Sequence, residues 1–123
     1  MEQGAVGQFR FEDMEIWKRA VKIAHALFDA ADGLEEKCLY RFSEQLRGAT
    51  LSIPNNIAEG AGSRSNREFK QFLSIGRRSV FEVANMLFIF ADRKLVSREQ
   101  QVILTGELEE LSRMISSFRR SLD

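Results

Sequence analysis

SIPNNIAEGAGSRS, residues 52–65, contains the only proline of the chain, with helix-like sequence on both sides and a Gly-x-Gly directly after it. Apolar residues spaced alternately three and four apart run straight through Pro54, so we predict one helix that continues past its proline. Pro54 offers no N–H to the carbonyl of Thr50 and its ring crowds that turn, which predicts a kink. The Gly-Ala-Gly run at 60–62 predicts the end of this helix, with glycine in a left-handed cap.

A first helix is predicted upstream of this stretch. Apolar residues from Met14 to Ala31 follow the same spacing, a second apolar row lies beside them, and Gly33 is placed to end the helix. The helix that contains Pro54 is then expected to begin near Glu36 or Lys37. About half of the first helix surface is apolar, which fits either a thick core or a contact with another subunit.

Two further helices open with capping boxes, Ser65-Asn66-Arg67-Glu68 and Ser97-Arg98-Glu99-Gln100. The third helix is expected to reach about Lys94, and Gly76 within it indicates close approach of a neighbouring helix. Short loops between four amphipathic helices predict an all-α, up-down-up-down four-helix bundle.

Length and composition fit one domain. The chain has 123 residues, of which 44% are hydrophobic and 29% charged. We expect residues 1–12 to be an N-terminal extension, flexible in part, and residues 13–123 to form the bundle. No apolar run approaches the roughly 20 residues of a membrane span, and the first residues lack the order of a signal peptide. We therefore expect a cytoplasmic protein with no membrane partner.

Few residues indicate catalysis or metal binding. A di-metal bundle needs two Glu-x-x-His motifs, and the chain has a single histidine, His25. Cys38 has no histidine near it in sequence. We predict no metal site, no cofactor, no catalytic residues and no enzymatic activity. As a remote alternative, Arg19 and His25 loosely resemble the Arg-x(4–6)-His element of HEPN ribonucleases.

Polar residues interrupt the apolar pattern around the proline. Ser52, Asn56 and Glu59 lie at i, i+4 and i+7, and Asn56 takes a core position. Either these side chains repair the kink by hydrogen bonding, or they form a polar pocket at the end of the bundle. With the neighbouring turn and cap, the predicted structural motif comprises Ser52, Pro54, Asn56, Glu59, Gly60, Ser65 and Glu68.

The zero net charge conceals a basic middle segment. Residues 41–80 hold seven Lys or Arg and three Asp or Glu, a surplus of four positive charges. Clustered cations and exposed aromatics are typical of nucleic-acid binding, so we assign a candidate site to a basic stripe. Its members are Arg64, Arg67, Lys70, Arg77 and Arg78.

The same stripe has a second interpretation, as a solvated face or a protein-interaction surface. Apolar residues of the first and third helices then form a subunit interface, for which the candidates are Ile16, Ile23, Leu27, Phe81 and Phe88. The possible partners are therefore further copies of the chain, RNA or DNA, and an unidentified protein.

Two segments carry a resemblance to a known family: FEDMEIWKRAVKIAHALF (11–28) and QLRGATLSIPNNIAEGAGSRSNREFKQFLSIGRRSVFE (45–82). They resemble the four-helix-bundle proteins encoded by intervening sequences in bacterial 23S ribosomal RNA genes. SIPNNIAEG followed by S-x-x-E-F-x-x-F-L is the most specific part.

The resemblance implies a left-handed bundle that assembles as a homopentamer, without catalytic residues. A more distant similarity, to the accessory protein of diversity-generating retroelements, implies nucleic-acid binding. We therefore expect a non-enzymatic homo-oligomer that binds RNA or other nucleic acid, with a protein-interaction scaffold as the alternative.

Overall fold

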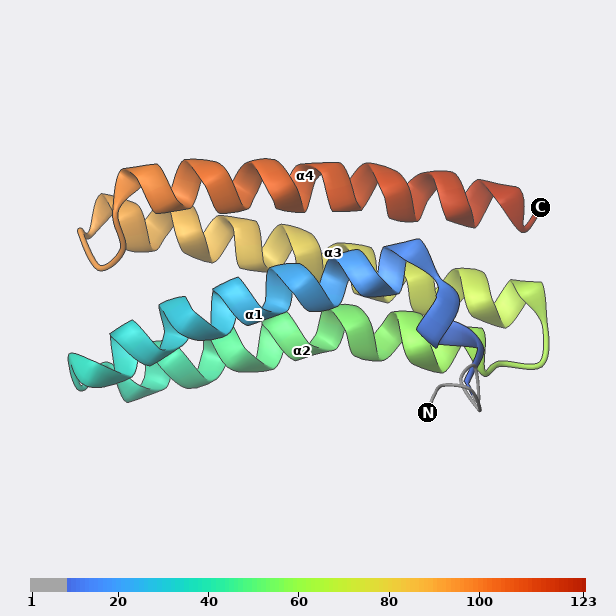
Figure 1. Cartoon of the computed structure of the whole chain (residues 1–123), viewed down its shortest axis with the longest axis horizontal. Helices are drawn as coiled ribbons and strands as arrows, with labels where there is room; N and C mark the ends of the chain where they lie inside the picture. Colours follow the sequence, from blue (N-terminus) through green and yellow to red (C-terminus); the bar gives the residue numbers. More distant parts are fainter. Residues whose placement is uncertain (1–8) are drawn as a thin grey trace, which may run out of the picture.

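The computed structural model describes residues 9–123, and every regular element in that part of the chain is helical. The 3-10 helix η1 spans Arg10–Asp13, followed by the α-helices α1 (Glu15–Glu36), α2 (Tyr40–Ala61), α3 (Asn66–Asp92) and α4 (Arg98–Ser121). The four long helices lie lengthwise beside one another and are joined by short loops (Figure 1). The predicted all-α four-helix bundle is confirmed, whereas its left-handedness and the kink at Pro54 stay predictions.

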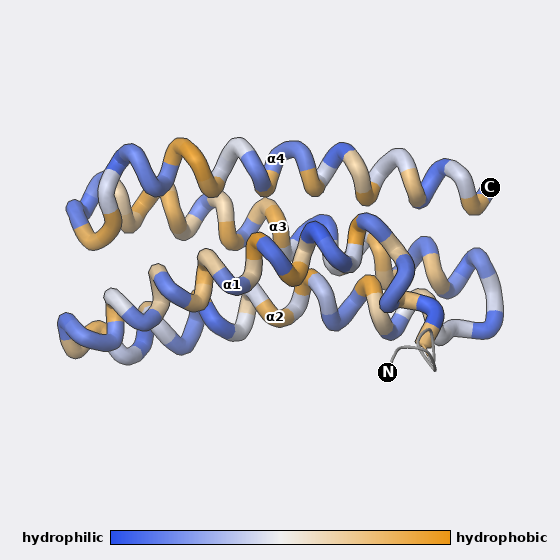
Figure 2. The backbone as a smooth tube through the Cα atoms, viewed as in Figure 1, coloured by the Kyte–Doolittle hydropathy of each residue, from blue (hydrophilic) through white to orange (hydrophobic). Residues whose placement is uncertain are grey.

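Each long helix alternates polar and apolar segments along its length, as expected for one buried face (Figure 2). The core is contiguous and draws fully buried side chains from every helix. Examples are Leu27 from α1, Ile57 from α2, Leu73 and Leu87 from α3, and Leu108 and Ile115 from α4.

The wide apolar surface of α1 is covered by the chain itself, because α1 packs against α2, α4 and η1. Ile16, Ile23 and Leu27 are only 5%, 1% and 0% exposed. Their predicted place in a subunit interface is therefore wrong: they belong to the core of the single chain. Phe81 and Phe88 of the same prediction are exposed.

The loop after α1 differs from the sequence-based expectation. The helix passes Gly33 and ends at Glu36, and α2 begins only at Tyr40. Cys38 takes a left-handed conformation at φ 63°, and the Leu39 N–H donates to the Leu34 carbonyl at 3.0 Å. With the Cys38 N–H donating to the Glu35 carbonyl at 2.9 Å, this Schellman arrangement satisfies the last carbonyls of the helix without glycine.

The same device ends α3 at Asp92. Lys94 has φ 61°, and the Leu95 N–H donates to the Phe90 carbonyl at 2.8 Å. At the start of α3 the Ser65 cap is confirmed, since its hydroxyl accepts from the Glu68 N–H at 3.1 Å. The return bond lies one residue earlier than predicted, because the Glu68 carboxylate accepts from the Arg64 N–H at 3.3 Å.

The stretch around the proline forms one continuous helix, as predicted. Gly62, the cap of α2, has φ −90°, so the predicted left-handed glycine cap is wrong. Gly60 instead allows close packing of α2 against α3: a Cβ there would lie 2.6 Å from Cδ1 of Phe69. At Gly76 a Cβ would lie 3.5 Å from the Ile53 carbonyl oxygen, which confirms the close helix approach.

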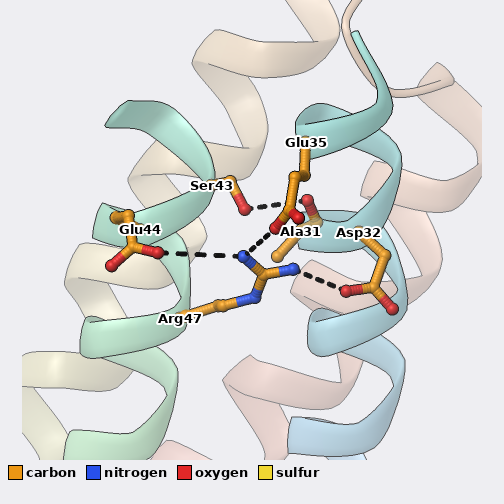
Figure 3. A network of polar contacts seen from close by, with 6 residues as sticks. All are labelled: Ala31, Asp32, Glu35, Ser43, Glu44 and Arg47. Carbon is orange, nitrogen blue, oxygen red and sulfur yellow. Dashed lines mark hydrogen bonds and ion pairs between the residues drawn. The ribbon is translucent and has the colours of Figure 1, made fainter. Parts of the chain in front are cut away.

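An ion-pair network joins α1 to α2 near their connecting loop (Figure 3). Arg47 donates from its two terminal nitrogens to Glu35 and Asp32, each at 2.6 Å. These hydrogen bonds, above all the one to Asp32, raise the pKa of the Arg47 guanidinium above its ordinary value. Nearby, the buried Ser43 hydroxyl donates to the Ala31 carbonyl at 3.0 Å. Across the pair of helices, the Arg47 charge is therefore balanced by carboxylates and the Ser43 hydroxyl has a hydrogen-bond acceptor.

The described end of the predicted N-terminal extension packs on the bundle. The ring of Phe11 lies 4.9 Å from that of Trp17, and the Arg10 guanidinium lies 5.1 Å from the ring centroid of Phe69. Residues 1–8 of the predicted flexible extension lie outside the described residues. Within residues 9–123 the helices are too short or too polar to cross a membrane.

Candidate nucleic-acid interface

The basic stripe of five residues lies at and along the first half of α3. The Ser65 cap fixes the start of this helix, and the helical period then places Arg67, Lys70, Arg77 and Arg78 within one sector of its surface. Every member is exposed except Lys70, which is half-buried. The predicted stripe is therefore present as a surface feature, and its ligand stays a proposal.

Lys70 is the one member of the stripe with a carboxylate partner in the part of the chain that the structure describes. Its Nζ lies 2.6 Å from Oδ1 of Asp123, and this hydrogen bond and charge hold the pKa of the Asp123 carboxyl below its ordinary value. The Arg77 guanidinium instead lies over the ring of Phe81, 4.9 Å from its centroid. A cation–π contact leaves the positive charge uncompensated.

Two arginines of α4 join this surface, and sequence analysis missed them. Arg119 Nε donates to Ser74 Oγ at 3.0 Å and to the Lys70 carbonyl at 3.3 Å, so α4 is bonded to α3 at this level. The two helices enclose a groove of about 340 Å³, which we call the arginine groove. Its lining residues are Ser74, Arg77, Arg78, Ser116, Arg119 and Arg120.

A signal for the α4 arginines was present in the sequence. In an antiparallel helix pair, residues at equal distances from the connecting turn lie opposite each other. Ser74 and Arg119 lie at nearly equal distances from the turn at 93–97. A reading of each helix by itself does not bring these two residues together.

Further along the same helix pair lies a second groove of about 410 Å³, which we call the apolar groove. It is lined mainly by Val80, Phe81, Ala84, Phe88, Val102 and Leu108. Phe81, Phe88 and Val102 are 56%, 49% and 58% exposed. Three large apolar side chains exposed around one hollow indicate a surface that another molecule covers.

The polar residues around Pro54 bond to each other and to α3. Asn56 Nδ2 donates to the Ser52 carbonyl at 2.7 Å and lies 3.0 Å from Ser52 Oγ, which is in turn 2.8 Å from Ser79 Oγ. The polar groups thus join α2 to α3. Glu59 is exposed and lies by a groove lined also by Arg10, Phe11 and Ala58. Both hydrogen bonds of the Asn56 amide go to Ser52, one turn earlier in the same helix.

The residues of the ribonuclease alternative have different neighbours. Arg19 pairs with Glu110 of α4, and its other terminal nitrogen contacts Met114 Sδ at 3.9 Å. His25 is exposed and packs edge-on against Phe28, with 6.4 Å between ring centroids. Among residues 9–123, no three His, Cys, Asp or Glu side chains are grouped so that they could hold a metal ion.

Comparison with solved structures supports the fold. A crystal structure of a protein of unknown function from the S23 ribosomal protein family of Bacteroides thetaiotaomicron superposes with a TM-score of 0.80. The two are 20% identical, and the match covers 85% of this chain and 97% of the other. None of the curated proteins matches the chain.

The family comparison reaches across most of the bundle. Residues 12–117, from the end of η1 to the last turns of α4, match the model of the 23S rRNA-intervening sequence protein. This span includes the proline-containing helix, the basic stripe and the capped start of α3. The chain therefore belongs to the 23S rRNA-intervening sequence protein family.

Proposed function

We propose that this protein is a non-enzymatic, homo-oligomeric RNA-binding or nucleic-acid-binding module that contacts phosphates through the basic stripe. One observation carries the proposal. Four of the five stripe residues, Arg64, Arg67, Arg77 and Arg78, are exposed, and their guanidinium groups have no carboxylate within ion-pair distance among residues 9–123.

Arginines without carboxylate partners on one face suit the binding of a polyanion better than they suit the stabilisation of the fold. Each positive charge that meets a phosphate releases a condensed counterion, so several such contacts give binding that weakens steeply with salt. The overall neutrality of the chain does not oppose this, because screening limits the influence of distant charges to about 10 Å at ordinary salt.

The test is fluorescence anisotropy with a labelled single-stranded RNA across a salt series. We expect the parent to bind at low salt and lose affinity steeply as salt rises. The triple variant Arg64→Ala/Arg67→Ala/Arg78→Ala should bind at least about tenfold more weakly, since each lost phosphate contact removes part of the salt-dependent term.

A charge-matched control separates a site from bulk charge. Lys22, Arg41 and Arg93 are also exposed and lie on other parts of the bundle. The variant Lys22→Ala/Arg41→Ala/Arg93→Ala removes the same three charges and should bind RNA nearly as the parent does. Equal loss in both variants would refute the assignment to the stripe, and no binding by the parent would refute the function.

The oligomeric part of the proposal rests on the apolar groove. A hollow of about 410 Å³ rimmed by exposed phenylalanine fits the side chains of a second copy. Five subunits are the number that the family resemblance implies. Light scattering at several concentrations should give a mass above that of one chain, and Phe88→Asp should lower it. Leu51, 46% exposed on α2 and outside the groove, provides the control Leu51→Asp.

The apolar groove also favours a second candidate function, that of a protein-interaction scaffold. In that case a neighbouring copy covers the groove around Phe81 and Phe88, and the basic stripe pairs with acidic residues of a neighbouring copy or of a partner protein. The scaffold predicts negligible RNA affinity at low salt together with a defined oligomer. The anisotropy experiment therefore decides between the two functions.

A further inference from the structure

We infer that the arginine groove is a discrete phosphate-binding site and that it, rather than Arg64 and Arg67, provides most of the affinity for nucleic acid. The inference rests on the proposed function, whose ligand class it narrows to phosphate groups held between α3 and α4. Nothing in the family match or in the superposed structure assigns a ligand to this groove.

The groove combines donors from two helices. Arg77 and Arg78 come from α3, Arg119 and Arg120 from the last turn of α4, and one serine hydroxyl from each helix completes the lining. Guanidinium groups bind phosphate oxygens through two parallel N–H bonds, and hydroxyls donate a further one. This set of donors matches a tetrahedral anion rather than an apolar or cationic ligand.

Arg119 is held in place by neutral groups, so no carboxylate among residues 9–123 neutralises its positive charge. Its Nε donates to Ser74 Oγ and to the Lys70 carbonyl, and both acceptors are neutral. The two terminal nitrogens have no carboxylate within 4.0 Å in the described part of the chain. A positioned guanidinium with free donors loses little conformational entropy when an anion arrives.

Three other arginines that join helices are paired with carboxylates. Arg47 has both terminal nitrogens on carboxylates of α1, and Arg19 pairs with Glu110 of α4. Arg98 likewise bonds Asp92 at 2.5 Å. At these three positions the charge of the arginine is balanced by a carboxylate of the neighbouring helix.

The four arginines of the groove do not follow that pattern. In the described residues none of them has a carboxylate within ion-pair distance, although they line one hollow of about 340 Å³. Like charges brought together destabilise a fold unless a counter-charge binds. Asp123 is bonded to Lys70, and the charge of Arg119 adds to that of Lys70 in lowering the pKa of its carboxyl, so one carboxylate acts as an internal counter-charge near four arginines. The groove is therefore short of negative charge, which a phosphate supplies.

Arg64 and Arg67 are differently placed. They lie at the start of α3, exposed and outside the groove lining. They contribute to the field that attracts a polyanion but enclose no ligand. Two double variants with equal charge change therefore separate the groove from the field.

The experiment compares Arg119→Ala/Arg120→Ala with Arg64→Ala/Arg67→Ala, each removing two positive charges, in the anisotropy assay with labelled single-stranded RNA. We expect the first pair to weaken binding about tenfold more than the second, since only the first removes enclosed contacts. Equal losses, or a larger loss from the second pair, would overturn the inference while the proposed function stood.

A second variant and a smaller probe keep the test decisive. Arg77→Ala/Arg78→Ala removes the two arginines that α3 contributes to the groove, and it should weaken RNA binding as much as Arg119→Ala/Arg120→Ala does. Because it keeps the contacts of Arg119 with α3, it also controls for a loosening of α4. Circular dichroism reports whether each variant is folded. Pyrophosphate is then titrated into isotopically labelled protein, and the chemical shifts of the backbone amides are followed by NMR.

Saturable shifts centred on Ser74 and Ser116 in the parent, absent in Arg119→Ala/Arg120→Ala, would support the site. If they occur without RNA binding, the groove takes a small phosphate ligand and the proposed function is wrong. If neither RNA nor pyrophosphate binds, both proposals are refuted.

Discussion

Gly60 gives the sharpest test of how α2 and α3 fit together. A methyl group in Gly60→Ala would lie 2.6 Å from Cδ1 and 3.0 Å from Cε1 of Phe69, and 3.0 Å from Cβ of Phe72. The Phe69 ring cannot move aside easily, because it is 1% exposed and packs 5.4 Å from the ring of Phe118. Overpacking of this kind costs about 1–3 kcal/mol, and better helix propensity returns at most about 1 kcal/mol.

We therefore expect Gly60→Ala to lower the free energy of unfolding by about 1–2 kcal/mol, a Tm decrease of roughly 4–8 °C. Gly48 lies in the same helix with nothing within 4 Å of its Cβ position, so Gly48→Ala should instead gain about 0.5–1 kcal/mol. Urea unfolding measures both, at one fixed protein concentration so that the proposed assembly affects both variants alike.

The contrast between the two glycines is the result that matters. If Gly60→Ala stabilises the protein as Gly48→Ala does, the close contact with Phe69 is wrong. A double-mutant cycle adds a check, because Phe69→Leu removes the ring atoms that the new methyl meets. The two changes should then be less destabilising together than the sum of each alone.

Three further changes test separate features. Thr50→Val should raise the free energy of unfolding by about 1 kcal/mol in urea unfolding, because the Thr50 hydroxyl is buried without a hydrogen-bond partner among the described residues. Ser65→Ala should lower it by about 1 kcal/mol through loss of the α3 cap, and an unchanged midpoint would refute the role of that cap. Asp123→Asn should tighten RNA binding in the anisotropy assay by freeing Lys70, and weaker binding would contradict this. The pKa of Asp123 is lowered in the folded state, so its stabilising contribution is present above the ordinary pKa and lost as pH falls through the lowered value. Asp123→Asn should therefore flatten the acid side of the stability profile.

Periodicity was sufficient to predict four helices and their buried faces, because an amphipathic helix repeats its apolar residues every three or four positions. It placed the end of α3 near Lys94, close to the observed end at Asp92, but not the end of α1, which passes Gly33 and ends at Glu36, before the left-handed Cys38. At both helix ends a backbone N–H beyond the turn bonds back to a helix carbonyl, Leu39 to Leu34 and Leu95 to Phe90, and a search for glycine does not find this arrangement.

Periodicity also could not say which apolar face stays uncovered. Ile16 and Ile23 of α1 and Phe81 and Phe88 of α3 all follow a helical spacing, yet only the phenylalanines are exposed. Coverage depends on how many neighbours a helix has, and this is a property of the assembled bundle. The arginine groove could not be predicted for the same reason, because Arg119 contacts Ser74 only when α3 and α4 are packed side by side.

Net charge is a poor guide to what this bundle binds, because its charges are sorted in space. Carboxylates pair with several arginines, including Arg19, Arg47 and Arg98. The two opposite charges of each pair largely cancel, so the pair adds little to the electric field at a distance. The four arginines of the groove have no carboxylate within ion-pair distance among the described residues. A polyanion experiences local charge within about a Debye length, not the sum over the chain. A neutral protein can thus present a strongly basic groove, and stability alone gives no reason to keep four arginines there.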